Sequence, residues 1–294
     1  MTKNSLTYLF ILASMLISAA GKVEAYQRKT QAMFVLVSSE SAQQAPKPSV
    51  INESGAIAGP IPLLMSEQRD DQFQLLPLKS PVAQFLTYIE EAMQRKISIK
   101  YYPWKRVLLS GENGEGIIFG IYKTKEREQI FTFSEPVYSD FVYLVMRCDA
   151  AFKFKTIADL KGKTIGMSPG ASAGDEFDRE VGVTIKPEYN SSSLAGQFSK
   201  LVQKRVDAFL YFEFSNNIER IQADINRRYA FSLDEYKIRK TDIFCVAPQA
   251  LVNQENYFAI SKKHDKRTLN ELNKVLLNAR RNGDLEKIFM GHSQ

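Results

Sequence analysis

Cysteine and histidine are scarce in this chain, whose 294 residues contain two of each. The four residues are scattered and show none of the spacings of a zinc site, so we expect neither a bound metal nor another cofactor. Internal repeats are also lacking, which excludes a solenoid or propeller. No segment after the N-terminal twenty residues is long and apolar enough to span a membrane.

The charge balance is only mildly basic, with 39 Lys and Arg against 33 Asp and Glu. These basic residues are scattered and do not run together, which indicates a solvated surface and not a nucleic-acid partner. A hydrophobic content of 44% is enough for a sizeable core, and the length fits one large or two small domains.

The first 25 residues have the form of a secretory signal peptide. A polar start with Lys3 precedes an apolar run at 6–17, and small residues fit cleavage after Ala20 or after Ala25. The run is short for a membrane anchor, and no cysteine follows it to carry a lipoprotein anchor. We therefore expect export to the periplasm.

Export would place Cys148 and Cys245 in an oxidising compartment. They form either a disulfide that closes a long loop or two buried thiols, because geometry decides between these alternatives. Residues 26–55 are polar, contain two prolines and have no hydrophobic period, so we expect a disordered or loosely attached lead-in.

Helical and strand patterns alternate from residue 56 onward, which predicts an α/β fold with mostly parallel sheets. Residues 80–95 have helical spacing of apolar residues, with Ser80 as the expected cap and Pro81 in the first turn. Further helices are expected at 104–116, 173–180, 194–205 and 266–283, with a last one capped by Asp284. Strands are expected at 97–102, 116–122, 141–148, 163–167, 206–212 and 256–262.

Arg127 is the first candidate site residue, because it stands in a charged stretch directly before the aromatic residues Phe131, Phe133 and Tyr138. A guanidinium near a strand presents a planar fork that suits a carboxylate. The alternative is a surface ion pair with Glu126 or Glu128.

Ser172 is the second candidate, in the segment 163–177, where a strand is followed by a Gly/Ser loop and a helix. Backbone N–H groups at the start of that helix would face an anion, and the Ser172 hydroxyl would add a donor. Residues 170–174 also match G-x-S-x-G, the nucleophile elbow of α/β hydrolases. No HGGG-type loop accompanies it, and the only histidines, His264 and His292, lie in a polar loop and at the tail.

Aromatic residues form the third candidate: Tyr102, Trp104, Tyr211 and Phe212 would line a cleft or belong to the core. Glu213 follows them at the end of an apolar strand, where a carboxylate caps the next helix or contacts a ligand.

Six segments, in this order, resemble the bacterial extracellular solute-binding proteins of family 3. They are 120–138, 141–149, 152–172, 201–212, 256–263 and 277–289. The resemblance implies a two-lobed periplasmic binding protein type II fold with the ligand cleft between the lobes. Lobe I would comprise 56–138 and the returning 256–294, and lobe II would comprise 139–255. The first strand must lie within 55–75, in an unclear register.

The resemblance also implies roles for individual residues. Thr124, Glu126 and Arg127 match the family's T-x-E-R motif, in which the arginine clamps the ligand carboxylate, and Gly120 heads that motif. Ser172 matches the hydroxyl residue of lobe II that completes the carboxylate site.

Two positions depart from the family's pattern. Tyr122 replaces a small hydroxyl residue, and Phe212 stands where an aspartate binds the ligand's α-ammonium. Either Glu213 takes that role, or the ligand has no α-amino group. We expect Tyr102, Trp104, Tyr122 and Phe212 to form an apolar wall.

These observations predict a monomeric periplasmic protein that closes its lobes over a small carboxylate-bearing solute and delivers it to an inner-membrane ABC permease. The prediction is a binding protein without catalytic residues. The alternative is a dehydratase-like enzyme on the same fold, with Glu213 as the general acid.

Overall fold

The computed structural model describes residues 59–70, 72–189, 193–230, 237 and 241–290. They belong to one compact unit of the chain, Ser49–Gln294. The predicted signal peptide and lead-in, and His292, lie outside the described residues.

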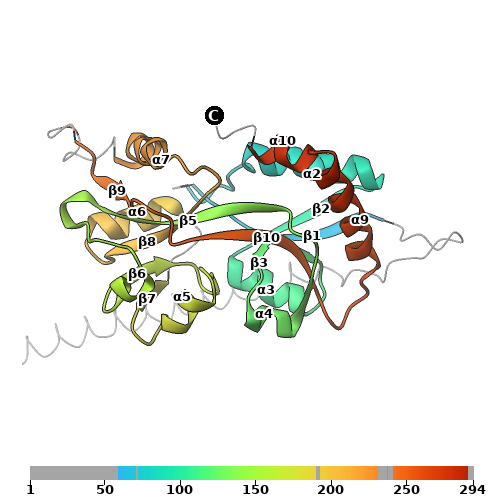
Figure 1. The fold of residues 1–294 in the computed structure, drawn as a ribbon, viewed down its shortest axis with the longest axis horizontal. Coiled ribbons are helices and arrows are strands. Elements are labelled where there is room, and N and C mark those ends of the chain that lie inside the picture. Colours follow the sequence, from blue (N-terminus) through green and yellow to red (C-terminus); the bar gives the residue numbers. More distant parts are fainter. Residues whose placement is uncertain (1–58, 71, 190–192, 231–236, 238–240, 291–294) are drawn as a thin grey trace, which may run out of the picture. The chain divides into compact units, whose positions relative to one another are not determined.

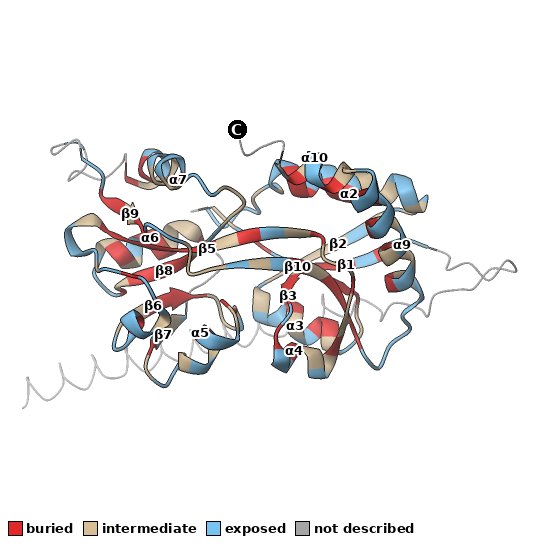
Figure 2. Cartoon of the chain, in the orientation of Figure 1, coloured by how far each residue is buried: buried red, intermediate tan, exposed pale blue. Residues whose placement is uncertain are grey.

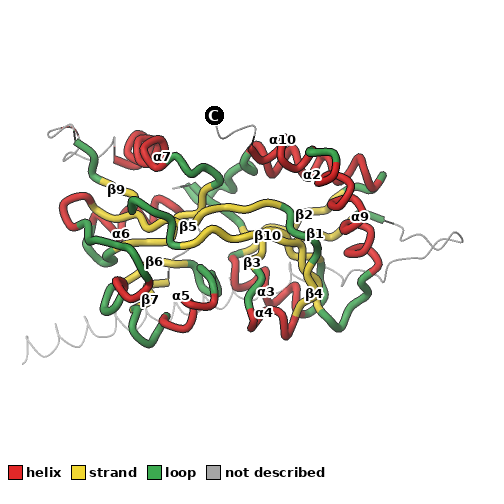
Figure 3. The backbone as a smooth tube through the Cα atoms, in the orientation of Figure 1, coloured by secondary structure: helices red, strands yellow, loops and turns green. Residues whose placement is uncertain are grey.

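Strands and helices alternate as predicted (Figures 1 and 3). The strands are β1 (Ile61–Ser66), β2 (Ile97–Tyr102), β3 (Ile117–Tyr122), β4 (Phe131–Phe133), β5 (Tyr138–Arg147), β6 (Thr164–Met167), β7 (Lys186–Tyr189), β8 (Ala208–Glu213), β9 (Phe244–Val246) and β10 (Val252–Ser261). The helices are α2 (Ser80–Met93), α3 (Trp104–Glu112), α4 (Lys125–Ile130), α5 (Asp175–Glu180), α6 (Leu194–Val202), α7 (Ile218–Ile225), α9 (Arg267–Arg281) and α10 (Asp284–Met290).

The sheet runs in the order β2-β1-β3-β10-β5-β8-β6-β7. Parallel pairs build each half, β1 with β2 and β3 in one lobe and β6 with β7 and β8 in the other. The long strands β5 and β10 lie side by side between the halves and pair antiparallel (Figure 3). The predicted α/β class and two-lobed fold are confirmed. The sheet is mixed because β10 pairs antiparallel with β3 and β5, and β5 pairs antiparallel with β8.

Buried residues lie along the strands of both lobes (Figure 2). Each lobe has a cluster of apolar side chains on each face of its part of the sheet. In lobe I, α2, α9 and α10 cover one face, where the rings of Phe119 and Phe258 lie within 6.0 Å of Phe85. Helix α3 contributes to the core on the other face. In lobe II, α5 packs on the side of Val142 and Leu210, and α6 and α7 pack on the side of Tyr143 and Phe209.

Helix α2 differs from its prediction at the start. The cap is Lys79, whose carbonyl accepts the first helical hydrogen bond, from Ala83 N. Ser80 is therefore inside the first turn, and its hydroxyl accepts a hydrogen bond from Gln84 Nε2 at 3.0 Å. The expectation of a serine cap was wrong by one position.

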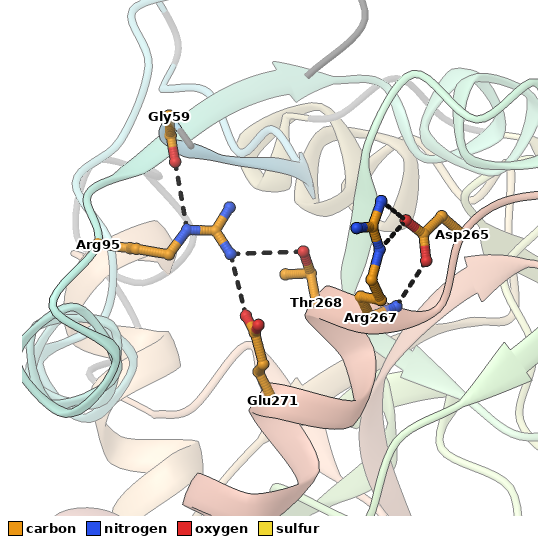
Figure 4. Close-up of polar contacts among 6 residues, drawn as sticks. All are labelled: Gly59, Arg95, Asp265, Arg267, Thr268 and Glu271. Atoms are coloured by element: carbon orange, nitrogen blue, oxygen red, sulfur yellow. Dashed lines mark hydrogen bonds and ion pairs between the residues drawn. The ribbon is translucent and has the colours of Figure 1, made fainter. Parts of the chain in front are cut away.

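Arg95 fastens three segments of lobe I just after α2 ends (Figure 4). Its Nε donates to Gly59 O at 3.2 Å, ahead of β1, and its Nη1 lies 3.2 Å from Glu271 Oε2 and 3.4 Å from Thr268 Oγ1 on α9. Asp265 and Arg267 form a separate ion pair at the start of α9.

A disulfide joins Cys148, after β5, to Cys245 in β9, at a sequence separation of 97. Of the two alternatives left open by the sequence, the structure contains the bridge. Closing a loop of that length restricts the unfolded chain, which corresponds to on the order of 4–5 kcal/mol in the chain-entropy account.

Candidate functional site

The candidate site lies at the edge of the sheet where the carboxyl ends of parallel strands meet, the usual position of ligand sites in α/β folds. Ser66 at the end of β1 pairs with Tyr102 at the end of β2, and β3 ends at Tyr122 on the same edge. The loop after β6 in lobe II approaches this edge. There Gly170 O accepts hydrogen bonds from Trp104 Nε1 at 2.9 Å and from Arg127 Nη2 at 3.0 Å.

Arg127 lies in α4, a helix that Thr124 caps by accepting a hydrogen bond from the Arg127 amide. Its side chain is buried, with 8% of its surface exposed. Nη1 donates to Tyr122 O at 2.8 Å, and the guanidinium lies 5.6 Å from the centre of the Trp104 ring. The local sequence therefore turns the arginine inward, toward the cleft.

The guanidinium has no carboxylate within ion-pair distance among the described residues. Glu128 pairs with Lys123 at 3.1 Å, so it does not form the surface ion pair weighed as an alternative for Arg127. Burial lowers the pKa of Arg127, although the charges of Asp178 and Glu126 oppose that shift. A buried cation without an ion-pair partner is costly, and a ligand carboxylate would supply one.

Ser172 is buried and bonded within its own loop. Its hydroxyl donates to Asp178 Oδ2 at 2.5 Å and accepts from Gly174 N at 3.1 Å. Asp178 Oδ1 accepts from Ala173 N, and burial raises the pKa of Asp178. A carboxylate of the chain thus already occupies part of the turn at which we expected an external anion.

The geometry does not support a serine nucleophile. Ser172 donates to a carboxylate and has no histidine partner among the described residues. His264 packs against lobe I, where a Cβ added at Gly114 would lie 1.9 Å from His264 Nε2.

Tyr122 connects the cleft to the crossing strands. Its carbonyl accepts a hydrogen bond from Arg127 Nη1, and its hydroxyl donates to Asp140 Oδ1 at 2.5 Å. Asp140 Oδ1 also accepts a hydrogen bond from Asn256 Nδ2 at 3.0 Å. Burial raises the pKa of Asp140 to about 6. The sequence reasoning missed Asp140 and Asn256, although a carboxylate inside the apolar stretch 138–147 was a usable signal.

Phe212 and Glu213 point to opposite faces of β8, as neighbouring strand residues do. Phe212 pairs in register with Val142, and its ring centre lies 6.2 Å from that of Tyr122. Glu213 pairs with Lys79 at 3.2 Å and accepts a hydrogen bond from Phe214 N. The structure thus brings Phe212 to Tyr122 and places Glu213 in a separate ion pair.

The remaining candidates divide between cleft and core. Gly120 has φ +77, which favours glycine, and a Cβ added there would crowd the Tyr138 hydroxyl at 3.2 Å. Tyr102 carries the Arg106 guanidinium 4.4 Å from its ring centre. Tyr211 faces away from Phe212 and packs beside Phe209 in the lobe II core.

Glu67, directly after β1, is a further buried residue that the sequence reasoning missed. Its Oε2 lies 2.7 Å from Arg69 Nη2, and the Arg69 backbone forms a bridge with Ser193, the cap of α6. The register of the first strand, which the sequence left unclear, is that of β1, which pairs with β2 from Ile61 to Ser66.

Comparison with solved structures gives matches at low identity and moderate similarity. An ancestral arginine-binding protein bound to arginine has a TM-score of 0.58 at 18% identity, covering 80% of this chain and 98% of that one. A Salmonella typhimurium periplasmic binding protein with high arginine specificity has 0.57 at 17%, covering 81% and 100%. An ancestral amino-acid-binding protein, a precursor of cyclohexadienyl dehydratase, has 0.58 at 17%, covering 80% and 96%.

These structures share the fold described above. The family model of the bacterial extracellular solute-binding proteins, family 3, matches residues 83–292, which is most of the chain. In the described part of the chain, no helix combines the length and apolar character needed to cross a membrane. The chain belongs to the bacterial extracellular solute-binding proteins, family 3.

Proposed function

We propose that this protein is exported to the periplasm and there captures a small carboxylate-bearing, amino-acid-like solute between its lobes for uptake by an ABC permease. The observation that carries the proposal is the buried Arg127 guanidinium, which has no carboxylate partner among the described residues. A carboxylate that accepts two of its N–H groups would compensate its desolvation.

The position of Gly170 supports lobe closure. Two donors of lobe I, Trp104 Nε1 and Arg127 Nη2, converge on this single carbonyl of lobe II. A ligand carboxylate between lobe I and the loop after β6 would accept hydrogen bonds from these two donors and would also contact lobe II. Contacts of that kind exist only when the lobes are together, so they favour the closed state.

The ligand's remaining part would meet aromatic rings. Trp104 lies beside the arginine, Tyr122 accepts a hydrogen bond from it, and Phe212 lies beside Tyr122. Phe212 offers an ammonium only a ring face, worth roughly 0.5–2 kcal/mol. We therefore expect common polar L-amino acids to bind weakly. Carboxylates with an aromatic, apolar or differently placed polar part would bind better.

An enzymatic role has less support. The dehydratase-like alternative relied on Glu213 as the acid, and this carboxylate is engaged by Lys79 and by a backbone amide. The arginine specificity and the link to a dehydratase belong to the structural neighbours, whose identity to this chain is below 20%.

A thermal-shift screen of carboxylates on the mature chain tests the proposal. A ligand present at about 100 times its dissociation constant stabilises the folded protein by about 2.7 kcal/mol. We expect a shift that is absent in Arg127→Ala, together with stoichiometric capture of unchanged ligand. Turnover of the bound compound would favour the enzyme, and a complete lack of carboxylate binders would contradict the proposal.

A further inference from the structure

We propose that Asp140 is a second ligand-binding group of the cleft, whose free oxygen receives an amino or guanidino group of the solute that Arg127 holds by its carboxylate. This inference rests on the proposed function and specifies the ligand further: a zwitterion whose cation is recognised from strand β5 and not from position 212.

Register places Asp140 on the same face of the sheet as Val142 and Phe212. Asp140 and Val142 are two residues apart in β5 and share a face, and Val142 lies opposite Phe212 of β8. Tyr122 contacts both residues, because its ring lies near that of Phe212 and its hydroxyl donates to Asp140. The Asp140 carboxylate is therefore on the strand next to Phe212, two residues before the direct partner of Phe212.

Hydrogen-bond accounting leaves one oxygen of Asp140 available. Oδ1 accepts from both Tyr122 and Asn256, whereas Oδ2 accepts from none of the described residues. Among the described residues, Gln197 Oε1 is the side-chain N or O atom that is both fully buried and without a hydrogen-bond partner. Asp140 Oδ2 also lacks a partner, so it is not fully buried. Asp140 Oδ2 therefore keeps contact with solvent, although the residue is only 8% exposed.

The charges around Asp140 do not neutralise it. Tyr122, Tyr138 and Asn256 are neutral donors or neighbours on β3, β5 and β10. Lys79 and Glu213 act on it from a longer range with opposite signs and pair with each other.

Arg127 and Asp140 thus form a complementary arrangement. Each is a buried charge without an ion pair among the described residues, and they contact opposite ends of Tyr122, its carbonyl and its hydroxyl. A small molecule with a carboxylate at one end and a cation at the other would compensate both charges at once.

Proton competition gives this arrangement a pH dependence. Burial raises the pKa of Asp140 to about 6, and only the ionised form attracts a cation. As the pH falls below that value, a proton must leave before the cation binds, so affinity should fall by up to about tenfold per pH unit.

Calorimetry with matched ligand pairs tests the role of Asp140. The pairs are δ-aminovalerate with valerate and γ-guanidinobutyrate with butyrate, measured on wild type, Asp140→Asn and Glu213→Gln. Asparagine keeps an oxygen for Tyr122 and Asn256, and a thermal melt without ligand verifies folding. We expect the cationic member of at least one pair to bind about 30-fold more tightly near pH 8. That ratio should approach one in Asp140→Asn, persist in Glu213→Gln and shrink near pH 5.

Three results would overturn the inference: no cationic preference in either pair, a preference that survives Asp140→Asn, or one that Glu213→Gln abolishes instead. Arg127→Ala separates this failure from failure of the proposed function. If plain carboxylates bind and need Arg127 but not Asp140, the proposed function stands and the role of Asp140 does not. If no carboxylate binding depends on Arg127, both are wrong.

Discussion

Two residues of opposite charge at this site each carry a cost in stability. Arg127 and Asp140 are buried charges whose partners are backbone carbonyls and neutral side chains, so the folded protein bears their desolvation. Such charges lower stability unless something compensates them. Their retention in the cleft is understandable if compensation arrives with a ligand.

Replacing Arg127 by alanine should leave the fold intact and weaken binding of a carboxylate ligand by about 2–5 kcal/mol, because the ligand charge would be buried unpaired. Arg127→Lys should restore only part of the loss, since lysine lacks the planar fork. Calorimetry measures both variants. Unchanged affinity in Arg127→Ala would eliminate the carboxylate clamp.

Ser172 should behave as a hydrogen-bond donor to Asp178. Its replacement by alanine leaves a partly buried carboxylate with one donor fewer, so the free energy of unfolding should fall by about 1–3 kcal/mol. The wild type should not react with a fluorophosphonate probe. Mass spectrometry that finds covalent label on Ser172 would restore the hydrolase interpretation.

At the scale of elements, the sequence located helices and strands well where periodicity was strong. Helix α2 was recognised from apolar spacing and a proline in the first turn, β2 from alternation, and β5 from its β-branched and aromatic residues. The direction of β5 and β10 was not predictable, because antiparallel pairing between residues such as Tyr138 and Asn256 depends on contacts far apart in the chain.

The site was predictable in part for the same reason. Arg127 has a local motif, and its helix, cap and inward direction follow from neighbouring residues. Asp140 has no local motif, since its importance arises from Tyr122 and Asn256 on two other strands. Asp178, the partner of Ser172, lies only six residues away, but a Gly/Ser loop before a helix favours an external anion as much as a carboxylate of the chain.

Arg95 is the element-scale contact with the clearest consequence. Arg95→Ala removes hydrogen bonds to Gly59 and α9 and an ion pair to Glu271. The Arg95 side chain is only 14% exposed. We expect a loss of about 1–3 kcal/mol in the free energy of unfolding with unchanged ligand affinity, because these contacts lie in lobe I outside the cleft. Arg267→Ala, which removes an exposed ion pair nearby, is the matched control and should cost less than about 1 kcal/mol. Equal melting curves for the two variants would contradict the role given to Arg95.

For the whole molecule, export and processing are the first requirement of the proposed function. The N-terminal pattern predicts that mature protein from the periplasm begins at Gly21 or Tyr26. N-terminal sequencing of the periplasmic fraction measures this directly. Recovery of protein that retains Met1 in the cytoplasm would contradict it.

The route of the chain through the two crossing strands also sets an order of assembly. Lobe II is a single continuous insertion, entered along β5 and left along β10, whereas the lobe I core needs Phe258, Leu272 and Phe289 from the end of the chain. Domains generally fold as units, so lobe II can complete its core while α2 and β1–β3 still expose apolar faces. The N-terminal half of lobe I must therefore wait for the last forty or so residues, and a chain truncated before α9 should be a substrate for chaperones and proteases even though its lobe II is folded.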